Sequence, residues 1–354
     1  KSKYVGFVHM GSKHAMISSP GVLVRTGRTS WAKPPLHQPP RKGLFRECFV
    51  PRPGYVYCST DWNMAELVAL AQINIWLFGE SEMAASLNAG MDMHLDFAAD
   101  LLGISYEEAK RRKAAGDPDV AIHRQFAKPA NFGFPGGLGA RSFVTYARDM
   151  AGIVLDETEA KALQSRWLGK YPEMVKYFDF FSRAAGQAES GFTYRQWVSG
   201  RNRGDVGYCN GCNTGFQGLI ADALKSFMRC LTRACYLRDG GYEEGRIVRV
   251  KEDSFDEFVE VTGPVATGEM SPLYGARPVL SLHDEGITEI PDDDPKATHR
   301  AAQAQADLMV MVLRSYCPDL EPACKATPAL MRRWYKAAEA VYDADGTLVP
   351  WEPR

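Results

Sequence analysis

The expected fold of this chain follows from residues 55–67, which read YVYCSTDWNMAEL. Residues 55–60 have the pattern of a β-strand, and Asp61 ends it. From Met64 to Ile75 apolar residues recur at helical spacing, which predicts a helix. Asp61 therefore stands at a strand-to-helix corner, where a carboxylate can face a cleft.

A second aspartate, Asp284, lies in the motif LSLHDE of residues 280–285. The apolar runs 278–282 and 287–290 flank it, which predicts a β-hairpin whose turn carries the acids. Either acidic motif alone is weak, because short patterns recur by chance. Together they matter, since metal ions held between carboxylates can clamp the attacking and leaving oxygens of an in-line phosphoryl displacement.

Between the two aspartates lies a cationic and aromatic segment, RQFAKPANFG, which starts at Arg124. At about 100° per residue, Arg124, Lys128, Asn131 and Phe132 fall on one helical face. A triphosphate along that face would meet paired donors from Arg124 and a point charge from Lys128. The alternative is a solvated cationic face. Pro129 is better tolerated if the helix starts near Lys128 or bends there.

The composition is that of an ordinary globular protein with room for two or three subdomains. Of the 354 residues, 45% are hydrophobic and 24% are charged. No apolar run approaches the roughly 20 residues of a membrane span, and no segment has the form of a secretion signal, so secretion is not expected. The first residue is Lys1, so we expect a processed chain or part of a longer one.

The eight cysteines are scattered, mostly in apolar stretches, which is typical of a reducing compartment. Cys209 and Cys212 have no second pair nearby to complete a zinc site, and we expect two thiols in a loop.

The formal net charge of −1 hides an uneven distribution. Every charged residue before Glu47 is basic, which suits phosphate contacts, although a solvated arm would have the same composition. Residues 20–54 are rich in Gly, Pro and basic residues, which predicts an extended strap across a surface rather than a helix.

The rest of the chain is predicted to be mainly helical from residue 82 to 190, with strands within 245–278. The expected helices cover residues 92–102, 106–115, 157–168, 172–188, 215–237 and 295–316.

Seven ordered segments resemble the C-terminal polymerase region of DNA polymerase family A, the DNA polymerase I family. Residues 61–67, 124–133 and 282–285 resemble its first, second and third motifs. The other four are Thr26-Gly27-Arg28, Arg46-x2-Phe49, Asp92-x-His94 and the run from Asn213 to Lys225. One such match is weak, but seven in the family's order are specific.

The resemblance implies an α+β fold with the right-hand polymerase architecture. We expect an antiparallel palm sheet, a largely helical fingers subdomain and a thumb that is mostly absent. The strap and first part of the palm would span residues 1–85, the fingers 86–200, and the rest of the palm 201–354. Residues 246–278 look like a β-rich insertion. Only 25 residues precede Thr26, so thumb and exonuclease are expected upstream or on a second polypeptide.

The resemblance also implies roles for single residues. Two Mg²⁺ ions would be held by Asp61, Asp284 and the carbonyl of Trp62, with Glu285 beside them. Residues in contact with the dNTP would be Arg124, Lys128, Phe132, Glu66 and His94. Lys128 would also give a proton to the leaving pyrophosphate. Residues in contact with the primer–template would be Arg28, Gln38, Asn213, Gln217 and His283.

The implied activity is that of a DNA-templated DNA polymerase core, which joins a dNTP to a primer 3′-hydroxyl and releases pyrophosphate. A single-subunit RNA polymerase is the nearest enzymatic alternative. Glu66, which would crowd a sugar 2′-hydroxyl, and Phe132 argue against it. A non-catalytic, polymerase-derived DNA-binding subunit is the other alternative, against which the intact aspartates argue. The expected setting is the cytoplasm of a bacterium or a phage-infected cell, with a phage replicase as one source.

Some positions depart from the family pattern without removing a metal ligand. Gly136 stands where the family has a tyrosine that closes the template slot, and Phe134 is a candidate to substitute for it. Cys209, His37 and Val68 stand in place of an arginine, a glutamine and an arginine.

Overall fold

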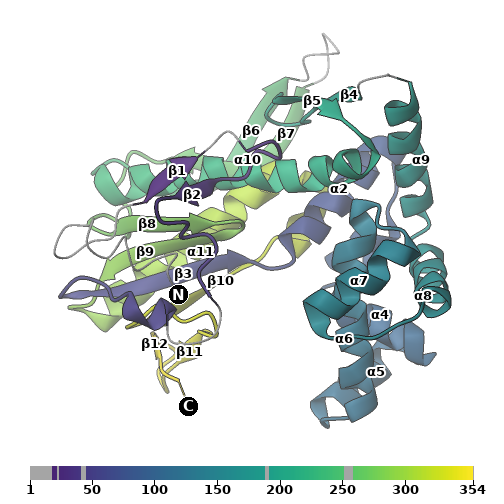
Figure 1. The fold of residues 1–354 in the computed structure, drawn as a ribbon. Helices are drawn as coiled ribbons and strands as arrows, with labels where there is room; N and C mark the ends of the chain where they lie inside the picture. The colour runs from purple at the N-terminus through teal and green to yellow at the C-terminus, as the bar shows by residue number, and fades with distance from the viewer. Residues whose placement is uncertain (1–17, 22–23, 41–44, 188–190, 251–257, 354) are drawn as a thin grey trace. The chain divides into compact units, whose positions relative to one another are not determined.

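The computed structural model describes residues 18–353, apart from 22–23, 41–44, 188–190 and 251–257 (Figure 1). Much of the predicted basic arm lies outside the described residues, namely Lys1, Lys3, Lys13, Arg41 and Lys42. None of the described helices combines the length and the apolar character of a membrane-spanning segment.

The chain divides into two compact units. Unit 1 comprises Lys1–Ala65, Ile220–Pro318 and Cys324–Arg354, and unit 2 comprises Glu66–Leu219 and Asp319–Ala323. The boundaries predicted after residues 85 and 200 both fall inside unit 2. The names palm and fingers stay predictions.

Unit 1 is built on a six-stranded sheet with the order β11-β12-β10-β3-β9-β8. Its strands are β3 (Tyr55–Trp62), β8 (Arg277–Leu282), β9 (Glu285–Pro291), β10 (Ala326–Met331), β11 (Val341–Tyr342) and β12 (Leu348–Trp351). The predicted antiparallel sheet holds for every pair except β10 and β12, which are parallel. The segment from β10 to β12 is long enough for the crossover that a parallel pair needs.

The two faces of β3 have different partners, because successive side chains of a strand point to opposite sides. On one face, Thr60 accepts a hydrogen bond from Gln305 of α11 (Pro295–Tyr316), and the Trp62 indole donates to the Met309 carbonyl. On the other face, Tyr57 packs in a core cluster with Leu36 of the strap. Asp61, four residues after Tyr57, lies on this second face.

The remaining elements of unit 1 are two hairpins, a short 3₁₀ helix and the second part of α10 (Tyr208–Tyr236). The short strands β1 (Ser19–Gly21) and β2 (Ser30–Ala32), with the 3₁₀ helix Arg46–Cys48, form the extended strap as predicted. The strands β6 (Tyr242–Val250) and β7 (Phe258–Ala266) pair antiparallel and contact α11, so strands are present where they were predicted within residues 245–278. That this segment is an insertion stays a prediction.

Unit 2 is helical apart from one hairpin, as predicted for residues 82–190. Its helices are α2 (Ala65–Phe78), α3 (Glu82–Asn88), α4 (Met93–Leu102), α5 (Tyr106–Ala114), α6 (Pro118–Gly133), α7 (Ala140–Ala151), α8 (Glu157–Lys170), α9 (Glu173–Gly186) and the first part of α10. The 3₁₀ helices Phe134–Gly136 and Pro318–Ala323 and the hairpin of β4 (Phe192–Arg195) and β5 (Asn202–Val206) complete the unit.

The helix α6 begins at Pro118, where the Asp117 side chain caps it, and Pro129 lies in its interior. Of the two ways to accommodate Pro129, a helix start near Lys128 therefore does not hold. One local prediction is wrong. The helix α10 starts at Tyr208, so Cys209 and Cys212 are helical rather than in a loop. All eight cysteines lie among the described residues, and all are free thiols.

Candidate active site

The two predicted acidic motifs meet at one end of β3 in unit 1. Asp61 of β3 lies directly opposite Glu285 of β9 in the antiparallel register. The backbone N–H of Trp62 donates to the carbonyl of Asp284 at 3.3 Å, which fastens the hairpin turn to β3 beside Asp61. His283 takes a left-handed conformation (φ 53°), as a two-residue hairpin turn requires. We call Asp61, Asp284 and Glu285 the carboxylate cluster.

Negative charge in the carboxylate cluster is poorly compensated. The Asp61 Oδ1 atom is buried and has no hydrogen-bond partner. Burial raises the pKa of Asp61 to about 8, and the neighbouring Asp284 and Glu285 add to the shift. Burial also raises the pKa of Asp284. A cation placed here would relieve both effects.

Glu285 is held more firmly than its two neighbours. Its side chain is buried, and its Oε1 accepts a hydrogen bond from the Ser59 hydroxyl at 2.5 Å. Its Oε2 lies 3.5 Å from the Nζ of Lys336. Lys336 was not among the predicted site residues, because it lies in a C-terminal segment without a recognisable motif.

One predicted DNA-contacting residue of the strap, Arg28, lies near this end of the sheet, and another, His283, lies in the hairpin turn itself. The Trp31 indole donates to the Ser281 carbonyl at 2.8 Å, which ties the strap to the strand β8. Burial lowers the pKa of Arg28, and Asp284 opposes that shift. Burial also lowers the pKa of His283, with further contributions from Arg28 and other nearby cations. Gln38 is exposed on the strap.

The carboxylate cluster fits a hard divalent cation completed by a substrate. Among the residues that the structure describes, no group of three or more His, Cys, Asp or Glu side chains is arranged to hold a metal by itself. Mg²⁺ usually binds one or two carboxylates together with water and substrate phosphates. Two aspartates, one with an orphaned buried oxygen, are such a donor set.

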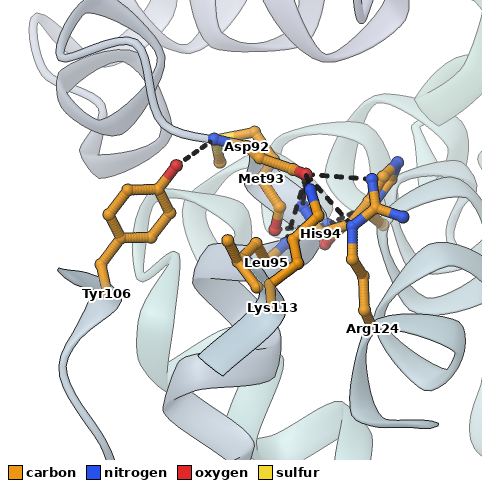
Figure 2. Close-up of polar contacts among 8 residues, drawn as sticks. Asp92, Met93, His94, Leu95, Tyr106, Lys113 and Arg124 are labelled. Atoms are coloured by element: carbon orange, nitrogen blue, oxygen red, sulfur yellow. Dashed lines mark hydrogen bonds and ion pairs between the residues drawn. The ribbon is translucent and has the colours of Figure 1, made fainter. Parts of the chain in front are cut away.

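In unit 2, Asp92 contacts two of the predicted nucleotide-binding residues, His94 and Arg124 (Figure 2). Its Oδ1 accepts from the backbone N–H groups of His94 and Leu95 and so caps α4. Its Oδ2 accepts from Nε and Nη2 of Arg124 at 3.1 and 2.9 Å, and lies 3.2 Å from Lys113 Nζ. The attraction of Arg124 and these hydrogen bonds outweigh burial and lower the pKa of Asp92. No role was predicted for Asp92 from the sequence, although it stands in the Asp92-x-His94 motif.

The tautomer of His94 follows from its neighbours. The Trp167 indole can only donate, so the Asn131 atom 2.9 Å from it is the amide oxygen. The Asn131 nitrogen therefore donates to the Met93 carbonyl and to His94 Nδ1, at 3.0 and 3.2 Å. His94 thus accepts at Nδ1 and carries its proton on Nε2. Burial lowers the pKa of His94 to about 4, so it is neutral at pH 7.

The structure brings four of the five predicted nucleotide-binding residues together. The rings of Phe132 and His94 lie 5.3 Å apart, and Phe132 is 40% exposed. The charges of Arg124 and Lys128 both act on His94. We call Asp92, His94, Arg124, Lys128 and Phe132 the cationic cluster.

Asn131 differs from the other residues of the predicted helical face in its burial. It is buried, because it joins His94 to Trp167, whereas its neighbour Phe132 is exposed. The fifth predicted nucleotide-binding residue, Glu66, is half-buried in the first turn of α2.

The predicted DNA-contacting residues of α10 form a third group in unit 2. Gln217 donates to the Asn213 side-chain oxygen at 3.3 Å, and Asn213 donates to the Gly136 carbonyl at 3.2 Å. A Cβ atom built on Gly136 would lie 2.8 Å from the Asn213 amide nitrogen, so the glycine accommodates Asn213. The suggestion that Phe134 substitutes for the missing tyrosine is wrong, because Phe134 is fully buried and stacks on Phe143 with ring centroids 4.2 Å apart.

Comparisons with known proteins agree on one family. Residues 9–314 match the family model of DNA polymerase family A. The thermostable DNA polymerase I of Thermus filiformis is 25% identical over 326 residues, which cover 89% of this chain and 32% of that protein. DNA polymerase I of Chloroflexus aurantiacus is 25% identical over 304 residues, or 82% of this chain and 26% of that protein. The chain thus spans about a third or less of these relatives.

A solved structure has the same fold. It is the polymerase domain of Pol1 from M. smegmatis, in a complex with DNA primer–template and dNTP. The TM-score is 0.64 at 17% identity, and the match covers 93% of this chain and 50% of that chain.

Proposed function

The chain belongs to DNA polymerase family A, and on that premise we propose that it is the core of a DNA-templated DNA polymerase. It would join dNTPs to the 3′-hydroxyl of a primer and release pyrophosphate. We also propose that unit 1 provides the palm and unit 2 the fingers. The observation that carries the proposal is the carboxylate cluster. There Asp61 and Asp284 lie side by side, and a bound cation would stabilise their negative charge.

Asp61, Asp284 and the carbonyl of Trp62 would hold two Mg²⁺ ions. When bound, the ions would supply activation of the 3′-hydroxyl and neutralisation of phosphoryl charge. Glu285 would support this site from its fixed position against Ser59. Arg28 and His283, at the same end of the sheet, would contact the primer–template, as would Gln38, Asn213 and Gln217.

The cationic cluster would bind the triphosphate. Arg124 uses its Nε–Nη2 edge for Asp92, so its Nη1 end would take a phosphate oxygen. Neutral His94 would donate from Nε2–H, and Lys128 would give a proton to the leaving pyrophosphate. Phe132 would pack its exposed ring against the nucleotide. Glu66 would crowd a 2′-hydroxyl and so favour deoxynucleotides.

Further parts of the proposal rest only on the family resemblance described in the sequence analysis. A thumb and an exonuclease would come from an upstream region or a second polypeptide, and the protein would work in DNA replication in the cytoplasm of a bacterium or phage-infected cell.

The test is primer extension by the purified chain with Mg²⁺ and dNTPs. We expect Asp284→Ala to reduce the rate by at least about 10²-fold, because it removes a metal ligand. Asp293→Asn, an exposed change in the same unit, should keep the wild-type rate. Full activity of Asp284→Ala would overturn the proposal. A preference for ribonucleotides over deoxynucleotides would favour the RNA polymerase alternative.

A further inference from the structure

Lys336 is a cation at the carboxylate cluster that the family match does not cover. It follows β10 in the chain, beyond the residues 9–314 that match the family. Its Nζ lies 3.5 Å from Glu285 Oε2, and the two side chains are 43% and 9% exposed. The charge of Lys336 also acts on Asp61 and Asp284. One ammonium group thus faces all three acids.

The backbone next to Lys336 is packed against the rest of unit 1, which holds Lys336 close to Glu285. Trp334 is buried in the core cluster on the strap face of the sheet, and its backbone N–H donates to the Phe49 carbonyl at 3.1 Å. The guanidinium of Arg46 lies 4.5 Å from the centre of the Trp334 ring. The N–H of Tyr335 donates to Met331 Sδ at 3.2 Å. These contacts fix the backbone on the N-terminal side of Lys336.

A fixed positive charge and a divalent cation at the same acids oppose each other. The ammonium offsets part of the repulsion among the acids when no metal is bound, and it repels a metal that enters. Lys336 is partly exposed, so its side chain can move away from Glu285 more easily than a buried cation could.

We propose that Lys336 is an internal counter-ion of the carboxylate cluster, which stabilises the metal-free protein and weakens the binding of divalent cations. The proposal rests on the proposed function, because it takes the carboxylate cluster to be the metal site. It makes Lys336 a positioning residue rather than a catalytic one.

The test is Mn²⁺ binding to the full chain without DNA or nucleotide, measured by calorimetry and by electron paramagnetic resonance. We expect Lys336→Met to bind Mn²⁺ about tenfold more tightly than wild type, because a repelling charge is gone. Lys336→Arg keeps the charge and should bind like wild type. Arg332→Met is the matched control. It removes one positive charge from the same segment after β10, but Arg332 pairs with Asp292, at 2.7 Å, and not with the carboxylate cluster. The Mn²⁺ affinity of Arg332→Met should stay within about twofold of that of wild type, because the ion pair of Arg332 does not involve the carboxylate cluster.

A second measurement is thermal unfolding in EDTA and in Mn²⁺. Lys336→Met should have a lower Tm than wild type in EDTA, and Mn²⁺ should raise its Tm more than that of wild type. An unchanged or weaker Mn²⁺ affinity of Lys336→Met overturns the proposal. If the wild type extends primers and that result is found, only the role of Lys336 fails. The metal site of the proposed function fails as well if wild type binds no Mn²⁺, or if its Mn²⁺ binding is unchanged in Asp61→Asn.

Discussion

The carboxylate cluster and the cationic cluster differ in how well their buried charges are compensated. In the first, burial leaves like charges side by side, and the Asp61 Oδ1 atom has no partner. In the second, Asp92 already neutralises Arg124, and Asn131 fixes the ring of His94. Lys336 offsets only part of this repulsion, so the first cluster stays destabilised until a divalent cation binds, whereas the second is organised in advance for an anion. Mutations should affect stability in opposite directions in the two places.

The largest expected effect is that of Asp61→Asn, which should lose activity and gain stability. The pKa of Asp61 is raised to about 8 in the folded state, so its ionisation costs stability as the pH rises from about 4 towards 8. In EDTA at pH 8 we expect the variant to be more stable by on the order of 1 to 3 kcal/mol, measured by urea unfolding. At pH 5 the gain should be smaller. Primer extension should fall by at least about 10²-fold. A loss of stability at pH 8 would break the comparison.

The pH dependence of stability at His94 tests the same comparison in the cationic cluster. Its pKa falls from 6.5 to about 4 on folding, so the unfolded chain takes up a proton first as the solution is acidified. The stability that His94 contributes is complete above pH 6.5 and is lost between pH 6.5 and 4, by about 3 kcal/mol. His94→Gln should lack this loss when unfolding is measured across that range. His123→Gln, on α6 rather than α4 and outside the hydrogen-bond network of His94, should behave like wild type. Equal pH slopes for wild type and His94→Gln would contradict the assignment.

The smallest expected effect is that of Asp92→Asn, which keeps the cap of α4 but loses the charge that holds Arg124. We expect stability to fall by about 1 kcal/mol and the KM for dNTP to rise about three- to tenfold, because Arg124 is no longer oriented. If Asp92 acts through Arg124, the KM effect should disappear in an Arg124→Ala background. A KM effect of the same size in both backgrounds would show instead that Asp92 acts through the fold of α4.

The sequence predicted the residues whose pattern is local, and missed those whose role depends on contacts made far along the chain. Asp61, Asp284 and the cationic residues of α6 stand in short ordered motifs. Helical spacing gives the direction of Asn131 around α6 but not what covers it, so its burial against Trp167 was not predictable. Lys336 reaches the acids only because β10 pairs with β3.

The strand β10 itself was missed for a physical reason. Its sequence ATPALM contains Pro328, which argues against a strand inside a sheet. Pro328 pairs with Thr60 on the β3 side, whereas β12 pairs only with Leu330 and Met331. On the side of β10 away from β3, Pro328 therefore pairs with no described strand. The N–H group that proline lacks is not needed for pairing on that side.

The most direct test of the account is a double-mutant cycle on single-turnover incorporation of one dNTP in Mg²⁺, with Asp61→Asn, Asp284→Asn and both together. Residues that act as one metal site have strongly non-additive effects. We predict that each single variant loses at least about 10²-fold and that the double variant loses little more. Losses that multiply, or a variant that keeps the wild-type rate, would contradict the claim that the two aspartates form one site.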